Sequence, residues 1–208
     1  MITVVIGGSG SGKSDYAESL LDDFKGGKYY VATMQIYDAE MQRKVDRHRQ
    51  RRKDKGFDTI EQHKNISEII PAIMESMPED GAMRKHKAVL IECISNLVAN
   101  EMFSDEDNKV DTAEQSAKVS KEDSPGAAYK VGVADKILSE IRKVADYVDE
   151  FVIVTNNVVE DGIDYDTMTL NYIKTISDVN IGLAQLADKV VEVVVGIPLI
   201  VKKERPCQ

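Results

Sequence analysis

The chain has 208 residues, and its 27 Lys and Arg against 36 Asp and Glu give a formal net charge of −9. The length and the 42% of hydrophobic residues suit one domain, residues 1–208, with a substantial buried core. The acidic balance argues against a protein that coats nucleic acid. No apolar run approaches the roughly 20 residues that cross a bilayer, and the chain starts with a strand-like run instead of a signal peptide. Cys93 and Cys207 provide neither a disulfide framework nor a metal-ligand spacing, so a cytoplasmic location is expected.

Short apolar runs rich in β-branched residues alternate with segments of helical periodicity. The expected strands are Ile2–Ile6, Tyr29–Ala32, Val89–Ile91, Phe151–Val154, Val190–Val195 and Leu199–Val201. The expected helices lie near 13–24, 39–53, 66–77, 93–103, 134–149 and 168–188. Strands without polar alternation are typical of a sheet covered on both faces. We therefore predict an α/β fold of the P-loop NTPase type, a mostly parallel sheet flanked by helices. The last two runs, separated by Gly196 and Pro198, are expected as an antiparallel edge hairpin.

The strongest local signal follows the first expected strand. The segment Gly7-Gly8-Ser9-Gly10-Ser11-Gly12-Lys13-Ser14 fits G-x-x-x-x-G-K-[ST], and a helical pattern follows it. The glycines allow backbone N–H groups to surround phosphate oxygens. Lys13 is expected to reach the β- and γ-phosphates of a nucleotide, and the Ser14 hydroxyl is expected to bind Mg²⁺. An ordinary glycine-rich turn is the weaker alternative.

A basic segment lies on the expected helix 39–53. Between Arg43 and Lys55 there are eight basic and two acidic residues, a local charge of +6 that leaves −15 for the rest. One face of this helix carries Met41, Val45, His48 and Arg52. Nearby cations are expected to keep His48 neutral, and a neutral imidazole can attack phosphorus while arginines hold the phosphates. The residues alone favour a solvated basic helix with an incidental histidine. His63 and His86 lack comparable surroundings and are interpreted as surface residues.

The expected strand Val89–Ile91 ends in the carboxylate of Glu92. In P-loop proteins an acid at such a place assists the metal or the attacking group. Any strand can end in Glu, so Glu92 alone is a weak indication of a nucleotide site. Its separation in sequence from the P-loop is the one expected in such proteins, which strengthens the indication.

The segment Ser104–Tyr129 departs from the alternation of strands and helices. It contains seven acidic residues and three lysines, with almost no large apolar side chain. We interpret it as an acidic flexible insertion, and a partner-binding segment is the alternative.

Seven stretches together point to a family: GGSGSGKS, then YVATMQIYDAEMQRKV with DRHRQRR, TIE at Thr59–Glu61, LIECISNLVANEMF, FVIVTNNV, DVNIGLAQLADKV and VVVGIPLIVK. The chain resembles the bifunctional adenosylcobinamide kinase/adenosylcobinamide-phosphate guanylyltransferase family of cobalamin biosynthesis. The resemblance covers nearly the whole chain apart from 104–129 and the last few residues. Many families share the P-loop, whereas its combination with the His-containing basic helix and the ECIS run is much more specific.

This resemblance implies an enzyme that phosphorylates the aminopropanol hydroxyl of adenosylcobinamide with ATP or GTP. It then implies transfer of GMP from GTP to that phosphate through a guanylylated histidine, which gives adenosylcobinamide-GDP and pyrophosphate. His48 matches that histidine, so the resemblance favours His48 and Lys13 as catalytic residues. The nucleotide-binding positions that it implies outside the P-loop are Thr33, Met34, Gln35, Arg49, Gln50, Arg51, Arg52, Glu61 and Glu92.

Two stretches depart from the family pattern. Arg47-His48 stands where some members have two adjacent histidines, and 157–164 replaces a stretch that often contains Glu, Gly and a GI-P pattern. A homo-oligomer is expected, because active sites shared between subunits suit a small chain with a large corrinoid substrate. The alternatives are a P-loop small-molecule kinase without guanylyltransferase activity and a nucleotide-dependent binding module.

Overall fold

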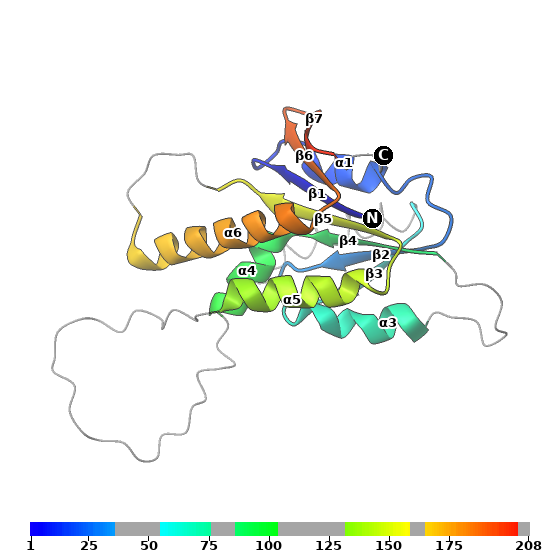
Figure 1. Ribbon diagram of the computed structural model, residues 1–208, viewed down its shortest axis with the longest axis horizontal. Helices are drawn as coiled ribbons and strands as arrows, with labels where there is room; N and C mark the ends of the chain where they lie inside the picture. The colour runs from blue at the N-terminus through cyan, green and yellow to red at the C-terminus, as the bar shows by residue number, and fades with distance from the viewer. Residues whose placement is uncertain (36–54, 76–85, 104–131, 159–164, 204–208) are drawn as a thin grey trace, which may run out of the picture.

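The computed structural model describes residues 1–35, 55–75, 86–103, 132–158 and 165–203. Seven strands form one sheet in the order β3-β2-β4-β5-β1-β6-β7 (Figure 1). Their bounds are β1 Ile2–Gly7, β2 Gly27–Ala32, β3 Phe57–Glu61, β4 Lys87–Glu92, β5 Glu150–Asn156, β6 Lys189–Val194 and β7 Ile197–Lys202. Neighbouring strands run parallel except β6 and β7, which pair antiparallel at one edge. The predicted mostly parallel sheet with a C-terminal edge hairpin is confirmed.

Helices cover both faces of the sheet (Figure 1). One face packs against α1, Lys13–Ser19. The other packs against the 3₁₀ helix η1 Ile66–Ile69 and against α3 Ile70–Glu75, α4 Ile94–Phe103, α5 Val133–Ala145 and α6 Thr167–Leu186. The α5 sequence explains its helix, because its buried residues Val133, Ile137, Ile141 and Val144 recur at helical spacing and form one apolar stripe.

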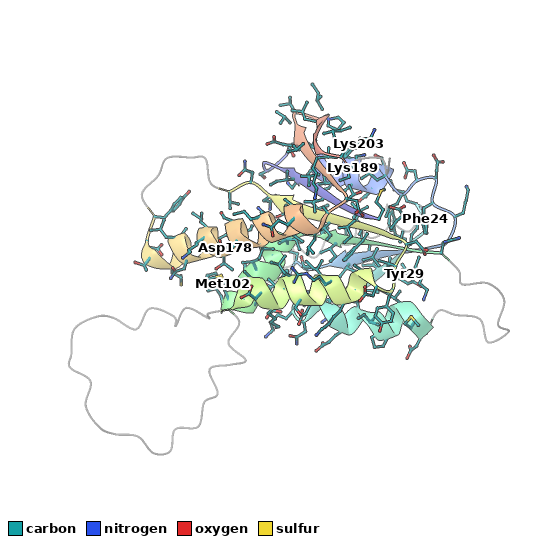
Figure 2. The ribbon with its side chains drawn as sticks, viewed as in Figure 1. Phe24, Tyr29, Met102, Asp178, Lys189 and Lys203 are labelled. Carbon is teal, nitrogen blue, oxygen red and sulfur yellow. The ribbon has the colours of Figure 1, made fainter. Side chains whose placement is uncertain are left out.

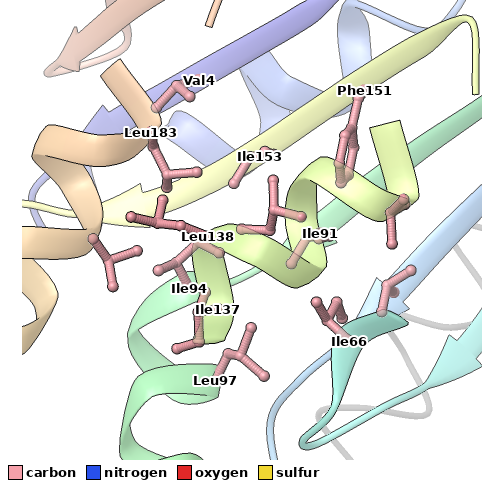
Figure 3. Close-up of a cluster of buried hydrophobic side chains, with 14 of the residues drawn as sticks. Val4, Ile66, Ile91, Ile94, Leu97, Ile137, Leu138, Phe151, Ile153 and Leu183 are labelled. Carbon is pink, nitrogen blue, oxygen red and sulfur yellow. The ribbon is translucent and has the colours of Figure 1, made fainter. Parts of the chain in front are cut away.

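Alternate residues of each strand serve the two layers, because successive side chains of a strand point to opposite faces. Val4 belongs to the larger buried cluster, with Ile91, Ile137 and Leu183 (Figure 3). The next residue, Val5, belongs to the smaller cluster beneath α1. In Figure 2 the labelled Tyr29 and Met102 belong to the larger cluster, and Phe24 packs against the smaller one. Strands buried on both faces explain the continuous apolar runs of the sequence.

The structure departs from the predicted elements in three places. The strand β3 was not predicted, because only Phe57 of its five residues is buried and the run has no continuous apolar pattern. The helix expected over 13–24 ends at Ser19, and i to i−3 hydrogen bonds continue the chain in turns. The helix expected over 66–77 begins as a 3₁₀ turn. The predicted helix 39–53 and the insertion 104–129 lie outside the described residues.

Parallel pairing places the carboxyl ends of six strands, β1 to β6, along one edge of the sheet. Ala32 at the end of β2 pairs with Glu61 of β3 and with Glu92 of β4. Gly7 at the end of β1 pairs with Asn156 of β5. Segments that are far apart in the sequence therefore meet at this carboxyl edge, which is where open α/β sheets bind ligands.

Candidate nucleotide site at the carboxyl edge of the sheet

The P-loop connects β1 to α1 and requires glycine at two positions. Gly10 and Gly12 have φ angles of +70° and +87°, a left-handed conformation that residues with a Cβ rarely adopt. Lys13 is buried, with only 7% of its surface exposed. Its Nζ donates a hydrogen bond to the Gly8 carbonyl oxygen at 3.0 Å. The Lys13 side chain is thus held by the backbone of its own loop.

The β6–β7 hairpin supports the P-loop from the side. The Gly196 backbone N–H donates to the Ser11 carbonyl oxygen at 2.8 Å. A Cβ placed on Gly7 would lie 2.6 Å from the Val193 carbonyl oxygen, so glycine is required there for close approach. This support could not be predicted from the sequence, because nothing in the local pattern links residues so far apart.

Ser14 and Glu92 meet across the carboxyl edge. The Ser14 hydroxyl donates to Glu92 Oε1 at 2.9 Å, which joins the start of α1 to the end of β4. A hydroxyl and a carboxylate are oxygen ligands of the kind that Mg²⁺ prefers. Within the described residues, no group of three His, Cys, Asp or Glu side chains is placed to hold a metal. A small number of protein ligands is what a P-loop magnesium ion requires, because substrate phosphates also coordinate it.

Thr33 occupies the interior beside this pair. Its side chain is fully buried, and its Oγ1 lies 3.0 Å from the Glu92 carbonyl oxygen and accepts from the Cys93 N–H at 2.8 Å. The Thr33 hydroxyl therefore joins the ends of β2 and β4. Met34 and Gln35 follow as half-buried residues, and Glu61 is exposed at the end of β3.

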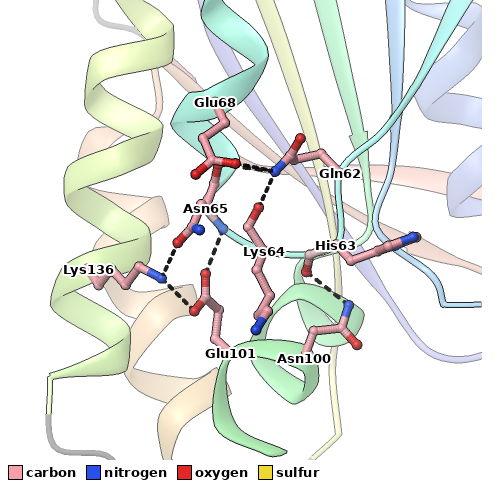
Figure 4. A network of polar contacts seen from close by, with 8 residues as sticks. All are labelled: Gln62, His63, Lys64, Asn65, Glu68, Asn100, Glu101 and Lys136. Carbon is pink, nitrogen blue, oxygen red and sulfur yellow. Dashed lines mark hydrogen bonds and ion pairs between the residues drawn. The ribbon is translucent and has the colours of Figure 1, made fainter. Parts of the chain in front are cut away.

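The α4 helix holds the loops after β2 and β3, and Figure 4 shows its contacts with the loop after β3. Asn100 Nδ2 donates to the carbonyl oxygens of Thr33 at 2.7 Å and His63 at 3.0 Å. The His63 Nδ1 itself lies 3.3 Å from the Thr33 oxygen, so this histidine is half-buried and is not the plain surface residue expected from the sequence. His86, in contrast, has a 64% exposed side chain, as predicted. Asn100 was missed because a lone polar residue on a helix carries no motif.

A buried carboxylate next to Asn100 fixes the same loop. Glu101 is 6% exposed, accepts from the Asn65 N–H at 2.8 Å and pairs with Lys136 Nζ at 2.6 Å. Asn65 has a φ angle of +50°. Glu140 of α5 lies close by and is also buried, and burial is the main cause that raises its carboxyl pKa.

Polar side chains also gather at the end of β5. Asn156 Nδ2 donates to Ser95 Oγ at 2.5 Å, and the Cys93 Sγ lies 2.9 Å from the same hydroxyl. Burial, followed by the Glu92 carboxylate, raises the pKa of the Cys93 thiol. The thiol therefore stays neutral and acts here as a hydrogen-bonding group.

The structure brings together the P-loop, Thr33–Gln35, Glu61 and Glu92 at one edge of the sheet. The predicted histidine His48 and the nucleotide-binding stretch Arg49, Gln50, Arg51 and Arg52 lie outside the described residues. In the part of the chain that is described, no helix is long and apolar enough to cross a membrane.

A P-loop between β1 and α1 and an acidic residue at the end of a parallel strand define a P-loop nucleotide-binding protein. The family described as cobinamide kinase / cobinamide phosphate guanyltransferase matches residues 3–201. The chain belongs to this family, which confirms the resemblance, and it is an enzyme of the kinase and nucleotidyltransferase class.

Two relatives carry the same name, bifunctional adenosylcobalamin biosynthesis protein CobU. The Escherichia coli K12 protein is 35% identical over 103 residues, which span 50% of this chain and 51% of that protein. The Salmonella typhimurium LT2 protein is 29% identical over 202 residues, 97% of this chain and 100% of that protein. The first alignment thus spans about half of its relative, and the second spans all of it.

Proposed function

We propose that this protein phosphorylates the aminopropanol hydroxyl of adenosylcobinamide with ATP or GTP, and then transfers GMP from GTP to the new phosphate. The observation that carries the kinase half is the hydrogen bond between Ser14 and Glu92, which brings a P-loop hydroxyl and a carboxylate to 2.9 Å. The family match supports both halves.

The P-loop residues divide the work of phosphoryl transfer. Backbone N–H groups of residues 7–14 surround the phosphates, and Lys13 neutralises charge on the β- and γ-phosphates. Ser14 and Glu92 would hold Mg²⁺, which when bound would supply positive charge that stabilises the phosphates. Such positioning and charge stabilisation account for most of the catalysis in phosphoryl transfer.

The guanylyl half rests on His48. A neutral imidazole nitrogen attacks the α-phosphorus of GTP, the bond to the α–β bridging oxygen breaks, and pyrophosphate leaves with that electron pair. The cobinamide phosphate oxygen then displaces the imidazole, and the basic residues Arg49, Arg51 and Arg52 hold the phosphates. Met34, Gln35, Gln50 and Glu61 complete the nucleotide site in this proposal, and the fully buried Thr33 supports it by joining the ends of β2 and β4.

The three histidines of the chain allow a matched test of the guanylyl half. Wild-type protein incubated with GTP labelled on its α-phosphate is expected to retain label after denaturation, in a bond that acid cleaves and alkali does not. His48→Ala should lose the label, while His86→Ala, a change at an exposed site, should keep it. Absence of label on the wild-type protein would leave a kinase without guanylyltransferase activity. Label retained by His48→Ala would assign the nucleophile elsewhere.

We also propose a cytoplasmic homo-oligomer that assembles through β7. All six residues of β7 are exposed, and Ile197, Leu199, Ile200 and Val201 are between 49% and 64% exposed. Side chains project from this edge hairpin in Figure 2. An apolar edge strand is covered in a stable protein, and a second copy of the chain has a complementary apolar edge. Ile200→Lys should shift the sedimentation of the protein towards the monomer, and an unchanged oligomer would place the interface elsewhere.

A further inference from the structure

The end of β5 lies between the two halves of the phosphate site. β5 pairs with β1 on one side and with β4 on the other. After β1 the chain passes to α1 on one face of the sheet, whereas after β4 it passes to α4 on the opposite face. Ligands of open α/β sheets bind where neighbouring connections leave in opposite directions. Asn156, the last residue of β5, occupies this position and pairs in register with Gly7 of the P-loop.

Contacts from two helices fix the Asn156 residue. Its backbone carbonyl accepts a hydrogen bond from Asn180 Nδ2 of α6 at 3.2 Å. Its side-chain Nδ2 donates to the hydroxyl of Ser95 on α4, which is only 5% exposed. Tyr172 of α6 holds Ser95 in turn through a hydrogen bond to its carbonyl oxygen at 3.2 Å. A residue that is held through both its backbone carbonyl and its side-chain Nδ2 keeps one orientation, which is the property expected of a binding group.

The Asn156 Oδ1 atom is the remaining hydrogen-bonding atom of this amide. Within the described residues it makes no hydrogen bond, whereas Nδ2 contacts both Ser95 and Cys93. Oδ1 and Nδ2 are bonded to the same trigonal carbon, so an Nδ2 held by Ser95 leaves Oδ1 pointing in a different direction from that hydroxyl. Asn156 stands in register with Gly7, the first residue of the P-loop. Oδ1 is therefore an acceptor at the end of the strand that neighbours this loop.

We propose that Asn156 Oδ1 accepts a hydrogen bond from the alcohol that the enzyme phosphorylates, and this proposal rests on the kinase function proposed above. The alcohol oxygen forms a bond to the γ-phosphorus while the bond from that phosphorus to the β–γ bridging oxygen breaks. The nucleoside diphosphate leaves with that electron pair, and the hydroxyl proton passes to water. An amide oxygen suits this place, because it accepts a hydrogen bond without the negative charge that would repel phosphates.

The test uses the full chain and compares Asn156→Ala with the control Thr155→Val. Thr155 is the preceding residue of β5, and its hydroxyl donates to Asn180 Oδ1 at 2.7 Å, so the control also disturbs the end of the strand. For each protein, kcat/KM for adenosylcobinamide, the Kd for ATP and the melting temperature are measured. Asn156→Ala should lower kcat/KM for the alcohol about 10- to 100-fold, because a small misplacement of a reactant costs rate on this scale. Its Kd for ATP should change less than about two-fold, a ratio that corresponds to a few tenths of a kcal/mol.

Two further variants keep the result interpretable. Asn156→Asp retains an acceptor oxygen, so it should recover alcohol affinity relative to Asn156→Ala but weaken ATP binding through its charge; it also serves if the alanine variant does not fold. Ser95→Ala frees Nδ2 and should raise the KM for the alcohol by a smaller factor. An unchanged kcat/KM in Asn156→Ala would overturn the proposal, as would a rise in the Kd for ATP that equals the loss in kcat/KM. A wild-type protein that does not phosphorylate the alcohol would instead refute the proposed kinase function itself, and this inference with it.

Discussion

Gly7 and Gly8 are adjacent glycines of the P-loop, but the space around their Cα atoms differs, so we expect alanine to have different effects on stability at the two positions. Both Gly7 and Gly8 belong to the G-x-x-x-x-G-K-[ST] segment. A Cβ on Gly7 would lie 2.6 Å from the Val193 carbonyl oxygen and 2.6 Å from Ser11 Oγ. A Cβ on Gly8 would meet nothing within 4 Å. We predict that Gly7→Ala destabilises the fold and that Gly8→Ala does not.

The size of the effect follows from how far the neighbours must move. A carbon at 2.6 Å from a backbone oxygen must retreat by several tenths of an ångström before contact is tolerable. The Ser11 hydroxyl can rotate away, but the Val193 carbonyl is part of the β6 backbone, and Val193 stands in register with Pro198 of β7. Overpacking against a fixed backbone costs about 1–3 kcal/mol, which corresponds to about a 5- to 150-fold change in the unfolding equilibrium.

The assay is urea denaturation of wild type, Gly7→Ala and Gly8→Ala, followed by far-ultraviolet circular dichroism. Tyrosine fluorescence provides a second probe, because the chain has eight tyrosines and no tryptophan. A lower midpoint with an unchanged slope identifies a loss of stability of the native state. Equal midpoints for the two variants would refute the reasoning, since it depends entirely on the contact between Gly7 and β6.

Three further changes test other parts of the structure. Asn100→Asp keeps the shape of the side chain but removes both donated hydrogen bonds, so it should lower stability by about 1–3 kcal/mol and raise the KM for GTP. Asn171→Asp, on α6, is its control, because no side-chain hydrogen bond of Asn171 occurs among the described contacts. Glu140→Gln should stabilise the protein at a pH above the raised pKa of the Glu140 carboxyl, where the wild-type protein buries a charged carboxylate. The native state favours the protonated carboxyl, so the gain over wild type should shrink as pH falls from that raised pKa to the ordinary pKa of Glu, and it should be absent below that ordinary value. Val195 is a β-branched residue at φ +45° followed by Gly196 at φ +82°, so Val195→Asn should raise the melting temperature of the monomer.

Most of the sheet could be predicted from the sequence because its strands are buried on both faces. Runs such as Val89–Ile91 have no polar interruption, and this pattern identifies a central parallel strand without reference to its neighbours. β3 lies at the opposite edge from β7, and only the first of its five residues, Phe57, is buried. Its pairing with β2, and not a local pattern, makes it a strand.

In the candidate site, too, some residues can be predicted from the local sequence, whereas the roles of others depend on partners far away in the chain. The P-loop carries its conformation in its own glycines, so the motif alone predicts Gly10, Gly12 and Lys13. Glu92 could be predicted from the strand before it. Asn100 and Asn156, in contrast, act through partners about 60 residues away in the chain, and such partners leave no trace in the local sequence. Only the packing of α4 against the sheet brings them to the site.

The position of α4 suggests why the two asparagines should have different effects. Its first turn carries Ser95, which holds Asn156 beside the phosphate loop, and its second half carries Asn100, which holds the loops after β2 and β3. A helix of ten residues spans about 15 Å, so one rigid element supports both regions at a fixed distance. A loss at Asn156 should then appear in the KM for the alcohol, and a loss at Asn100 in the KM for the nucleotide. Because each asparagine has its own hydrogen-bond partners, these losses should combine additively unless α4 itself moves.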